Sequence, residues 1–541
     1  MRRHLLSLFA TLLLPLQVAA TTIDLSVVNG DTRIVGADAN GFVGLTVRAG
    51  DVNGDSLKDL ILGAAGASPG GRAFAGRVYV FFGTGDTLAT TIDLAVATPD
   101  VVIEGNYASG QFGQRIATGD LNGDGIGDII AGAPFASPAA GTNAGIAYVI
   151  YGDSTWSGTT IDLSTTSADV TLTGGAGQEV GTGLAAGDID GNGVDDLVVG
   201  APKAEGPSRP AAGRVHIIYA DTVGSGNELA ATYNLGLHVA DFVIFGRDAS
   251  DNLGNDIIVE DMDADGLAEV IAAAFLANPD GEDNGGEVYV IEGRANYKAE
   301  FPVGTYSIPS TVLSPLYAIV KGDLEFGQAG YSIAVGDLTY DDVPDLAIGA
   351  NGESPSGRTA AGKVFVVDGT VLPGLTDLAV PEDVKFAVWG AVASDNVGFS
   401  VAVLNANGDG MDDLLVGAPF AAGFAGQAYV VFGDQQSSVI DLATDSADIT
   451  ILGDDASDLT GYAVSSIDVD GNGIEDLILG SPGATGANAS AGEVVVLLNS
   501  PPAVEMAPAD TFATYGSTAI LPLRVTAMTG LKMIEADLDL L

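Results

Sequence analysis

The chain of 541 residues carries 20 Lys and Arg against 71 Asp and Glu, a formal net charge of -51, and has 47% apolar residues, 75 glycines and no cysteine. An acid excess of this size excludes nucleic acid, whose phosphates would be repelled, and adsorption to an anionic membrane, and it favours cations as partners. The glycine content indicates many tight turns in place of long helices. Since no disulfide is available to hold the loops, bound metal is the natural substitute.

The first 20 residues are typical of a secretory signal peptide. Arg2 and Arg3 supply a positive start, Leu5 to Leu16 form a short apolar stretch, and Val18-Ala19-Ala20 fits a small-residue cleavage site. The sequence therefore predicts a secreted protein whose mature chain starts near Thr21. The alternative is a membrane anchor, but the apolar stretch falls short of the roughly 20 residues needed to span a bilayer, and no later segment is long enough.

Seven repeats follow, each built around a loop rich in Asp, Asn and Gly. The loops start 63 to 76 residues apart, at Asp51, Asp120, Asp188, Asp261, Asp337, Asn405 and Asp468. Seven residues before each start stands a glycine, at Gly44, Gly113, Gly181, Gly254, Gly330, Gly398 and Gly461. Short apolar runs bounded by glycine, such as RVYVFFG at 77–83 and DVVIEG at 100–105, are typical of buried strands. Each repeat is thus predicted to contain about four strands, and no stretch has sustained helical periodicity.

Four short strands repeated seven times predict an all-β fold, a seven-bladed β-propeller over residues 21–500. The alternative is an open stack of repeats, which would need a capping element at both ends. The segment TRIVGAD at 32–38 matches the strand that precedes the later loops, yet no earlier repeat exists for it to complete. We therefore expect it to pair with the last repeat near Val494 to Leu498 and close the ring.

The loops read D-x-[DN]-x-[DN]-G-x-x-D over nine residues, a pattern that predicts a cation site. Side-chain oxygens at positions 1, 3, 5 and 9 and the backbone carbonyl at position 7 can point at one centre. All donors are hard oxygens without Cys or His, which selects Ca²⁺ or Mg²⁺, and a flexible loop with several carboxylates favours Ca²⁺. The expected ligand sets, up to seven calcium sites of mainly structural role, are Asp51, Asn53, Asp55, Leu57 and Asp59; Asp120, Asn122, Asp124, Ile126 and Asp128; Asp188, Asp190, Asn192, Val194 and Asp196; Asp261, Asp263, Asp265, Leu267 and Glu269; Asp337, Thr339, Asp341, Val343 and Asp345; Asn405, Asn407, Asp409, Met411 and Asp413; and Asp468, Asp470, Asn472, Ile474 and Asp476.

Two other interpretations of the loops compete with this one. An EF-hand needs a bidentate Glu at position 12 and flanking helices, whereas position 12 is always apolar here: Leu62, Ala131, Val199, Ala272, Ile348, Val416 and Leu479. The loops could also be simple turns, for which Asp, Asn and Gly are favoured residues. Seven such patterns in register argue against that.

The seven loops are not equivalent. The first, second, third and seventh keep an oxygen side chain at every expected position. The fourth ends in Glu269, the fifth has Thr339 at position 3 and Pro344 at position 8, and the sixth begins with Asn405. We expect weaker binding in loops four to six.

The segments around the loops resemble the FG-GAP repeat of the integrin α-subunit N-terminal propeller. Phe112-Gly113 matches the FG element and Gly132-Ala133-Pro134 the GAP element, and the resemblance covers all seven repeats. It implies a seven-bladed propeller with calcium in loops that join two strands of a blade, and ligand binding, where it occurs, on the opposite face. Because nearly all repeats here carry such a loop, unlike integrins, integrin-type ligand recognition is not carried over.

The tail at 501–541 differs in character. It opens with Pro501-Pro502 and resembles the first strands of a cohesin-like β-sandwich. The alternative is a disordered linker. The predicted organisation is a signal peptide at 1–20, the propeller at 21–500, and a linker with an incomplete β-sandwich at 501–541.

No catalytic motif stands out, so the sequence predicts a protein that is not an enzyme. No nucleophile elbow, P-loop or zinc motif is present, and the mature chain has only His216 and His238, of which His216 falls at a strand position. We expect a secreted binding or adhesion module whose partner is an extracellular protein or glycan, with insertions at 203–210, 221–235 and 295–316 as contact loops. The alternative is a non-catalytic propeller of a larger secreted enzyme such as a hydrolase.

Overall fold

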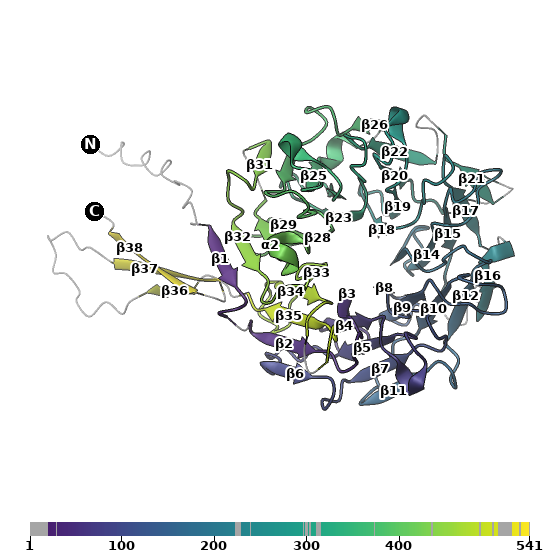
Figure 1. Cartoon of the computed structure of the whole chain (residues 1–541), viewed down its shortest axis with the longest axis horizontal. Coiled ribbons are helices and arrows are strands. Elements are labelled where there is room, and N and C mark those ends of the chain that lie inside the picture. The colour runs from purple at the N-terminus through teal and green to yellow at the C-terminus, as the bar shows by residue number, and fades with distance from the viewer. Residues whose placement is uncertain are drawn as a thin grey trace, which may run out of the picture.

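Seven five-stranded β-sheets surround a central axis like the blades of a propeller (Figure 1). The computed structural model describes residues 20–499 except 29, 222–228, 238–239, 296, 298–300, 302–303, 310–314, 373, 434–436 and 486–487, and three strands beyond residue 502. The predicted signal peptide and His238 lie outside the described residues. The predicted seven-bladed all-β propeller is confirmed.

Each blade contains four antiparallel strands and a fifth, outermost strand that pairs in parallel. From the axis outward, blade one contains β3 (Val43–Gly50), β4 (Asp59–Ala64), β5 (Arg77–Phe81), β7 (Val101–Glu104) and β11 (Thr159–Asp162), and blade two contains β8 (Arg115–Gly119), β9 (Asp128–Ala133), β10 (Ile146–Ile150), β12 (Val170–Thr173) and β16 (Thr232–Asn234). Blade three contains β13 (Leu184–Gly187), β14 (Asp196–Ala201), β15 (Arg214–Ile218), β17 (Phe242–Phe245) and β21 (Thr305–Ser307). Blade four contains β18 (Ile257–Glu260), β19 (Glu269–Ala274), β20 (Glu287–Ile291), β22 (Leu316–Lys321) and β26 (Gly374–Asp377).

Blades five to seven follow the same order. Blade five contains β23 (Ser332–Gly336), β24 (Asp345–Ala350), β25 (Lys363–Val367), β27 (Phe386–Trp389) and β31 (Val439–Asp441). Blade six contains β28 (Ser400–Leu404), β29 (Asp413–Ala418), β30 (Gln427–Val431), β32 (Ile449–Leu452) and β1 (Thr21–Asp24). Blade seven contains β33 (Ala463–Ile467), β34 (Asp476–Ser481), β35 (Glu493–Leu497), β2 (Thr32–Val35) and β6 (Thr91–Asp93).

The fifth strand of each blade, here called the crossover strand, comes from the next repeat. In blade one it is β11, which the chain forms between the third and fourth strands of blade two, and it pairs with β7 from Thr159↔Val101 to Asp162↔Glu104. The Arg72 guanidinium donates to the Asp162 carboxylate at 2.8 Å and fixes the end of this strand. Crossover strands therefore link each blade covalently and by hydrogen bonds to its predecessor.

The ring closes where the sequence predicted. Strand β2 pairs antiparallel with β35, with Ile34 opposite Val494 and Thr32 opposite Val496. The N-terminal β1 pairs with β32 of blade six, so both ends of the repeat array contribute to the closure (Figure 1). The open-stack alternative is excluded, because a closed ring leaves no blade without a neighbour.

The core lies between the faces of neighbouring blades, where the strands bury Val, Ile, Leu and Ala side chains. The paired glycines of the repeat allow this approach. A Cβ at Gly132 would lie 2.1 Å from the Gly181 carbonyl oxygen of the next repeat, so no side chain fits there. Gly181 itself has a φ of 88°, which glycine adopts without strain.

Helical structure is nearly absent from the described residues. It comprises α2 (Ala421–Phe424) and the short 3₁₀ turns η1 (Pro69–Gly71), η2 (Leu235–Leu237), η3 (Pro279–Gly281), η4 (Pro355–Gly357) and η5 (Gly369–Val371). A search of the described part finds no helix long and apolar enough to cross a membrane. In the tail, β36 (Ala503–Met506), β37 (Pro522–Thr529) and β38 (Lys532–Asp539) form a separate antiparallel sheet. Whether this sheet begins a β-sandwich stays a prediction.

Candidate metal loops

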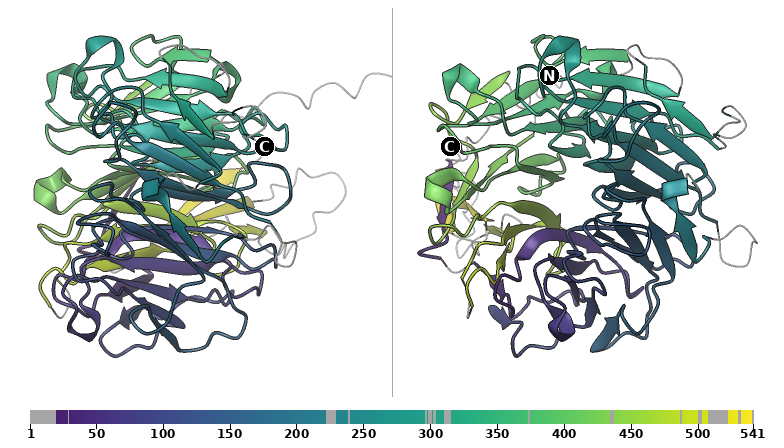
Figure 2. Two further views of the ribbon diagram at one scale, coloured as in Figure 1. Left: turned by 90° about the vertical axis from the view of Figure 1, so that its right-hand side faces the viewer. Right: turned by 45° about the vertical axis from the view of Figure 1, so that its right-hand side comes forward.

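The seven Asp-rich loops each join the first and second strands of a blade. Because all inner strands run in the same direction along the axis, the loops gather on one face of the disc, and the β4–β5 type connections lie on the other. The left view of Figure 2 shows the disc from its edge, with connections on both faces. Loop one, for example, spans 51–58 between β3 and β4. The sequence alone placed these loops correctly within the blade.

The residue at position 9 is the first residue of the second strand, and its carboxylate is buried. Asp128 is 0% exposed, and it accepts the Leu121 amide at 2.8 Å and the Gly152 amide at 2.9 Å. The first amide belongs to position 2 of the same loop, and the second follows the third strand of the blade. Position 9 therefore connects its loop to two strands whether or not a cation is bound. The equivalent residues, all at most 2% exposed, are Asp59, Asp196, Glu269, Asp345, Asp413 and Asp476.

The carboxylate at position 1 accepts hydrogen bonds from backbone amides of its own loop. In loop three, Asp188 Oδ1 accepts the Gly191 amide at 2.7 Å, and Asp188 Oδ2 accepts the Gly193 amide at 2.8 Å. Asp190 Oδ1 accepts the Asn192 amide at 3.1 Å. Each acid thus has oxygen lone pairs left over, because a carboxylate offers about four acceptor positions.

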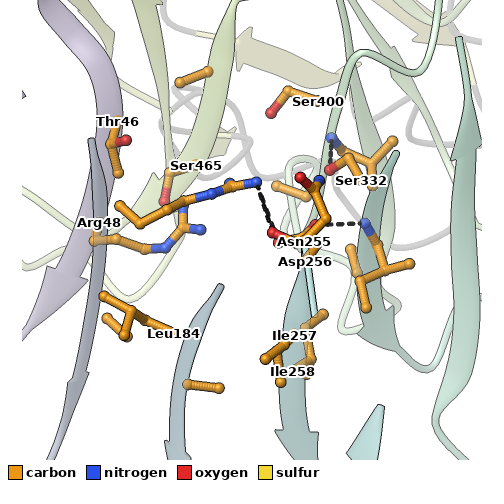
Figure 3. A pocket seen from close by; sticks show the side chains of 18 of the residues that line it. Thr46, Arg48, Leu184, Asn255, Asp256, Ile257, Ile258, Ser332, Ser400 and Ser465 are labelled. Carbon is orange, nitrogen blue, oxygen red and sulfur yellow. Dashed lines mark hydrogen bonds and ion pairs between the residues drawn. The ribbon is translucent and has the colours of Figure 1, made fainter. Parts of the chain in front are cut away.

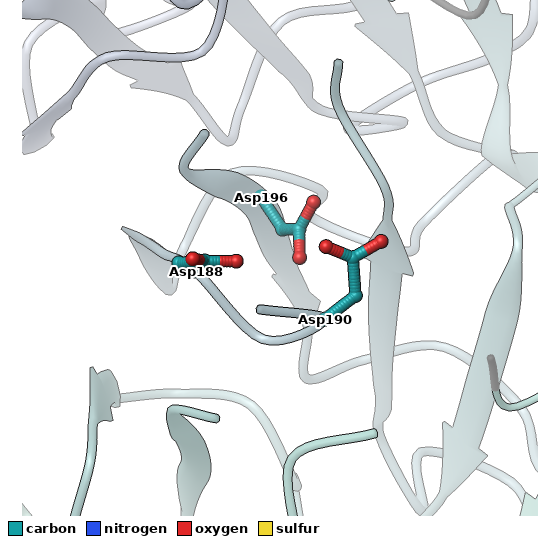
Figure 4. Close-up of side chains that lie close together, drawn as sticks. All are labelled: Asp188, Asp190 and Asp196. Carbon is teal, nitrogen blue, oxygen red and sulfur yellow. The ribbon is translucent and has the colours of Figure 1, made fainter. Parts of the chain in front are cut away.

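Three loops bring three acids within reach of a single ion. Ligand oxygens of Asp188, Asp190 and Asp196 all lie within 4.8 Å of one another, and Figure 4 shows the three side chains pointing toward a common centre. The same criterion holds in loops four and seven for Asp261, Asp263 and Asp265 and for Asp468, Asp470 and Asp476. The structure thus brings together predicted ligands that lie up to eight residues apart in sequence.

Loop one converges in the same way with an amide in place of one acid. Asn53 Nδ2 lies 3.1 Å from Asp55 Oδ2 and 3.5 Å from Asp59 Oδ1, so positions 3, 5 and 9 meet. In loop two, Asn122 is only 4% exposed. The Asn53 side chain therefore lies at the same centre as the acids of loop one.

Loops five and six depart from this arrangement at the residues that distinguish their sequences. In loop six, Asn405 at position 1 has a buried Oδ1 that accepts no hydrogen bond from any described residue. In loop five, the position 2 amide of Leu338 donates to the Gly336 carbonyl at 3.0 Å, whereas its counterparts donate to position 9. A buried oxygen without a donor is costly unless a cation or water occupies the space beside it. The all-oxygen donor sets and the buried Asn405 Oδ1 thus fit a hard cation.

Electrostatics point the same way. Burial, reinforced by the neighbouring loop acids, raises the pKa of Asp128 to about 7 and that of Asp196 to about 8, against the hydrogen bonds from backbone amides that lower both values. The same causes raise the pKa of Glu269 and of Asp476 to about 7. A nearby divalent cation favours the charged carboxylates and removes this penalty.

The EF-hand interpretation fails on the structure. Position 12 residues such as Leu62 and Val199 lie in the second strand of the blade and are fully buried. No helix flanks a loop in the described residues. The loop therefore ends at position 9, as the sequence indicated.

Neighbouring loops are joined to one another by a contact that the sequence analysis did not predict. The position 8 amide of one loop donates to the position 1 carbonyl of the preceding loop: Gly127 to Asp51 at 2.8 Å, Asp195 to Asp120 at 3.0 Å and Ala268 to Asp188 at 2.9 Å. At the junction of loops four and five, position 8 is Pro344, which has no N–H to donate. A series of hydrogen bonds thus joins the first four loops, and it is interrupted at this proline.

Of the three insertions predicted as contact loops, parts lie outside the described residues, including 222–228 and 310–314. Within 295–316, Tyr297 is fully buried and stacks on Phe242 with ring centroids 4.4 Å apart. That part of the insertion belongs to the core of blade three. His216 lies in β15 and is fully buried, as expected for a strand residue.

Comparison with known proteins supports the repeat assignment. The FG-GAP repeat family matches residues 43–81, 112–150, 180–218, 329–367, 397–431 and 460–497. The chain thus contains six FG-GAP repeats. The match omits blade four, where Ala273-Ala274-Phe275 stands in place of Gly-Ala-Pro, yet blade four folds like the others.

Two groups of curated relatives are found. The chain is 33% identical over 194 residues to phosphatidylinositol-glycan-specific phospholipase D of Bos taurus, covering 35% of this chain and 22% of the relative. It is 24% identical over 394 residues to the Homo sapiens protein of that name, and this match covers 70% of the present chain and 43% of the relative. It is 32% identical over 177 residues to integrin alpha-PS2 of Drosophila melanogaster, covering 31% and 12%. The chain thus spans less than half the length of each of these relatives.

Proposed function

We propose that the chain is a secreted propeller that holds Ca²⁺ in its loops and serves as an extracellular binding or adhesion module. The observation that carries the calcium proposal is the convergence of Asp188, Asp190 and Asp196 on one centre, repeated in loops four and seven. The role of the ion is structural. It offsets carboxylate repulsion in a protein that has no disulfides.

Direct titration tests the calcium proposal. Extracellular calcium modules typically bind at ~10⁻⁴–10⁻³ M, so isothermal titration of the chelator-treated chain should resolve several sites in this range. Mg²⁺ should bind more weakly, because it demands octahedral geometry that flexible loops do not impose. Absence of calcium binding at millimolar concentration would refute the proposal.

The binding proposal rests on the architecture. A rigid closed disc presents its connections on two broad faces, and such loops are favoured positions for contacts. The face opposite the metal loops carries exposed apolar side chains such as Phe74, Phe326 and Phe424, at 41%, 53% and 54%. Screening the purified chain against protein and glycan arrays, with and without calcium, tests this role. Retention of no partner on either array would count against it.

A second candidate function follows from the phospholipase D relatives. The chain would then be the non-catalytic propeller of a larger secreted hydrolase, since it covers only 22–43% of the cited relatives of that name. Incubating the purified chain with ester, phosphodiester and glycan substrates should yield no turnover. The full-length reading frame decides between the two proposals: a catalytic domain in the same polypeptide favours the hydrolase, and none favours the binding module.

A further inference from the structure

The axis of the propeller holds a cavity of about 540 Å³ lined by the innermost strands of all seven blades. Most of its wall is uncharged, as in the band formed by Ala117, Ala185, Ala334 and Ala402. Three charged side chains interrupt this wall well inside the channel, namely Arg48, Arg115 and Asp256. Figure 3 shows Arg48 and Asp256 on facing sides of the channel. Glu260 also lines the cavity, but it is exposed and adjoins loop four at the end of β18.

Asp256 is already engaged on both oxygens. Its Oδ1 lies 3.7 Å from Arg115 Nη2, and its Oδ2 accepts the Ile333 amide at 3.0 Å. The carboxylate is 9% exposed and is therefore a fixed part of the wall. Its single charge is offset by Arg115, which also donates from Nε to the Thr182 carbonyl at 3.1 Å.

Arg48 has no such partner among the described residues. Its one hydrogen bond there runs from Nη1 to the carbonyl of the adjacent Val47, at 2.9 Å, and no described carboxylate lies within ion-pair distance. A guanidinium has five N–H donors in a planar fork. Most donors of Arg48 are therefore available to a ligand within the channel.

With Glu260 included the charges that line the channel balance, but the region around Arg48 and Arg115 is net positive. Burial, followed by the Arg115 guanidinium, lowers the pKa of Arg48, while Asp256 acts in the opposite sense. Arginine nevertheless stays charged in proteins. Two guanidinium groups thus face one carboxylate inside a protein whose formal net charge is -51. Such an arrangement is costly unless an anion compensates it.

We propose that the central channel binds one small oxyanion, a carboxylate or sulfate, held by Arg48 and Arg115. The planar forks of two arginines match the oxygens of such a group, which accept several N–H bonds at once. The inner strands of two neighbouring blades carry the two residues, so the anion would link blades one and two at the axis. This site is separate from the calcium loops and needs no cation.

Titration of the calcium-loaded chain with sodium sulfate and, separately, sodium acetate at constant ionic strength tests the site. We expect one anion per chain. Arg48→Gln should weaken binding at least tenfold, because it removes the guanidinium that lacks a carboxylate. Asp256→Asn should instead tighten binding by about tenfold, because it removes the internal competitor while an amide oxygen remains for Ile333.

The opposite directions of these two effects separate a binding site from structural damage, which would weaken binding in both variants. Arg358→Gln is the matched control, since Arg358 pairs with Asp441 at 2.6 Å outside the channel and should leave anion affinity unchanged. Preference for acetate over sulfate would identify a carboxylate site, and the reverse a sulfate site. Absence of saturable binding of either anion, or equal weakening in Asp256→Asn and Arg48→Gln, would overturn the proposal.

Discussion

Loops three and six occupy the same place in their blades but differ in what holds them. In loop three, the carboxylate of Asp188 at position 1 accepts three backbone amides, at 2.7, 3.0 and 2.8 Å, and three acids converge. In loop six, Asn405 at position 1 receives none, yet Asp413 at position 9 still accepts the Ala406 amide at 2.8 Å and the Gly433 amide at 2.9 Å.

The contrast separates two roles that the repeat pattern combines. Position 9 maintains the fold of the blade, and its hydrogen bonds persist in a loop with a depleted ligand set. Positions 1, 3 and 5 differ in residue type between the loops, and on the calcium proposal they set the strength of the cation site. On the calcium proposal, a blade could lose its cation site without losing its strands, since β28 and β29 still pair on either side of loop six.

Removing calcium should produce the largest effect. With four complete loops, each contributing roughly 0.4–1.4 kcal/mol at millimolar calcium, chelation should cost about 2–6 kcal/mol of stability. Differential scanning calorimetry with and without EGTA measures the fall in melting temperature, and EGTA with excess calcium restored is the control. An unchanged melt would show that the loops hold no cation that stabilises the fold.

The separation of roles predicts different behaviour for two acids of the same loop. Asp196→Ala should cost about 2–4 kcal/mol even in EGTA, because it leaves two buried amides without an acceptor, and more in calcium, because it also removes a proposed ligand. Asp190→Ala should be destabilising in calcium and near neutral in EGTA, because its main partner would be the ion. Denaturant melts in both buffers measure the two values. An Asp196→Ala variant as stable in EGTA as the unchanged chain would contradict a separate role for position 9.

The blades and the closure of the ring could be predicted from the sequence because the repeats are numerous and in register. The recurrence of a glycine seven residues before each loop fixed the blades, and the unmatched 32–38 segment fixed the closure, which the pairing of Ile34 with Val494 confirms. The positions of the ligands within the blade also followed from the pattern, since loop and strand alternate strictly.

Other features left little signal in the sequence. The crossover strands are only three or four residues long, although the recurrent Thr-Ile-Asp at 22–24, 91–93 and 160–162 marks three of them. The channel cluster could not be found, because Arg48, Arg115 and Asp256 each occur in one repeat and meet only when the ring closes. The second role of position 9 was hidden because metal binding already explained an acid there.

The incomplete loop offers a gain-of-function test. Asn405→Asp should tighten calcium binding at loop six about tenfold, because it adds a carboxylate beside Asp409 and Asp413. Calcium titration of the variant should reveal one additional or strengthened site. Thr142→Asp, which adds the same charge in the β9–β10 connection on the opposite face, should leave calcium binding unchanged. Equal behaviour of the two variants would mean that loop six is limited by its backbone conformation.

The smallest expected effect on stability concerns the hydrogen bonds that join neighbouring loops. Ala268→Pro removes the N–H that reaches the Asp188 carbonyl at 2.9 Å and copies into loop four the proline that loop five carries at position 8. Loss of this hydrogen bond costs about 1 kcal/mol, and the stiffer unfolded chain offsets about half of it. A net loss near 0.5 kcal/mol in EGTA melts is expected, with Ala268→Gly as the control that keeps the N–H.

A loss of about 3 kcal/mol or more would mean that loops four and five differ in backbone conformation, since Pro344 is tolerated at the equivalent position. A small loss would instead show that the bond between adjacent loops is dispensable for folding, which leaves the crossover strands and the interblade core as what holds neighbouring blades together.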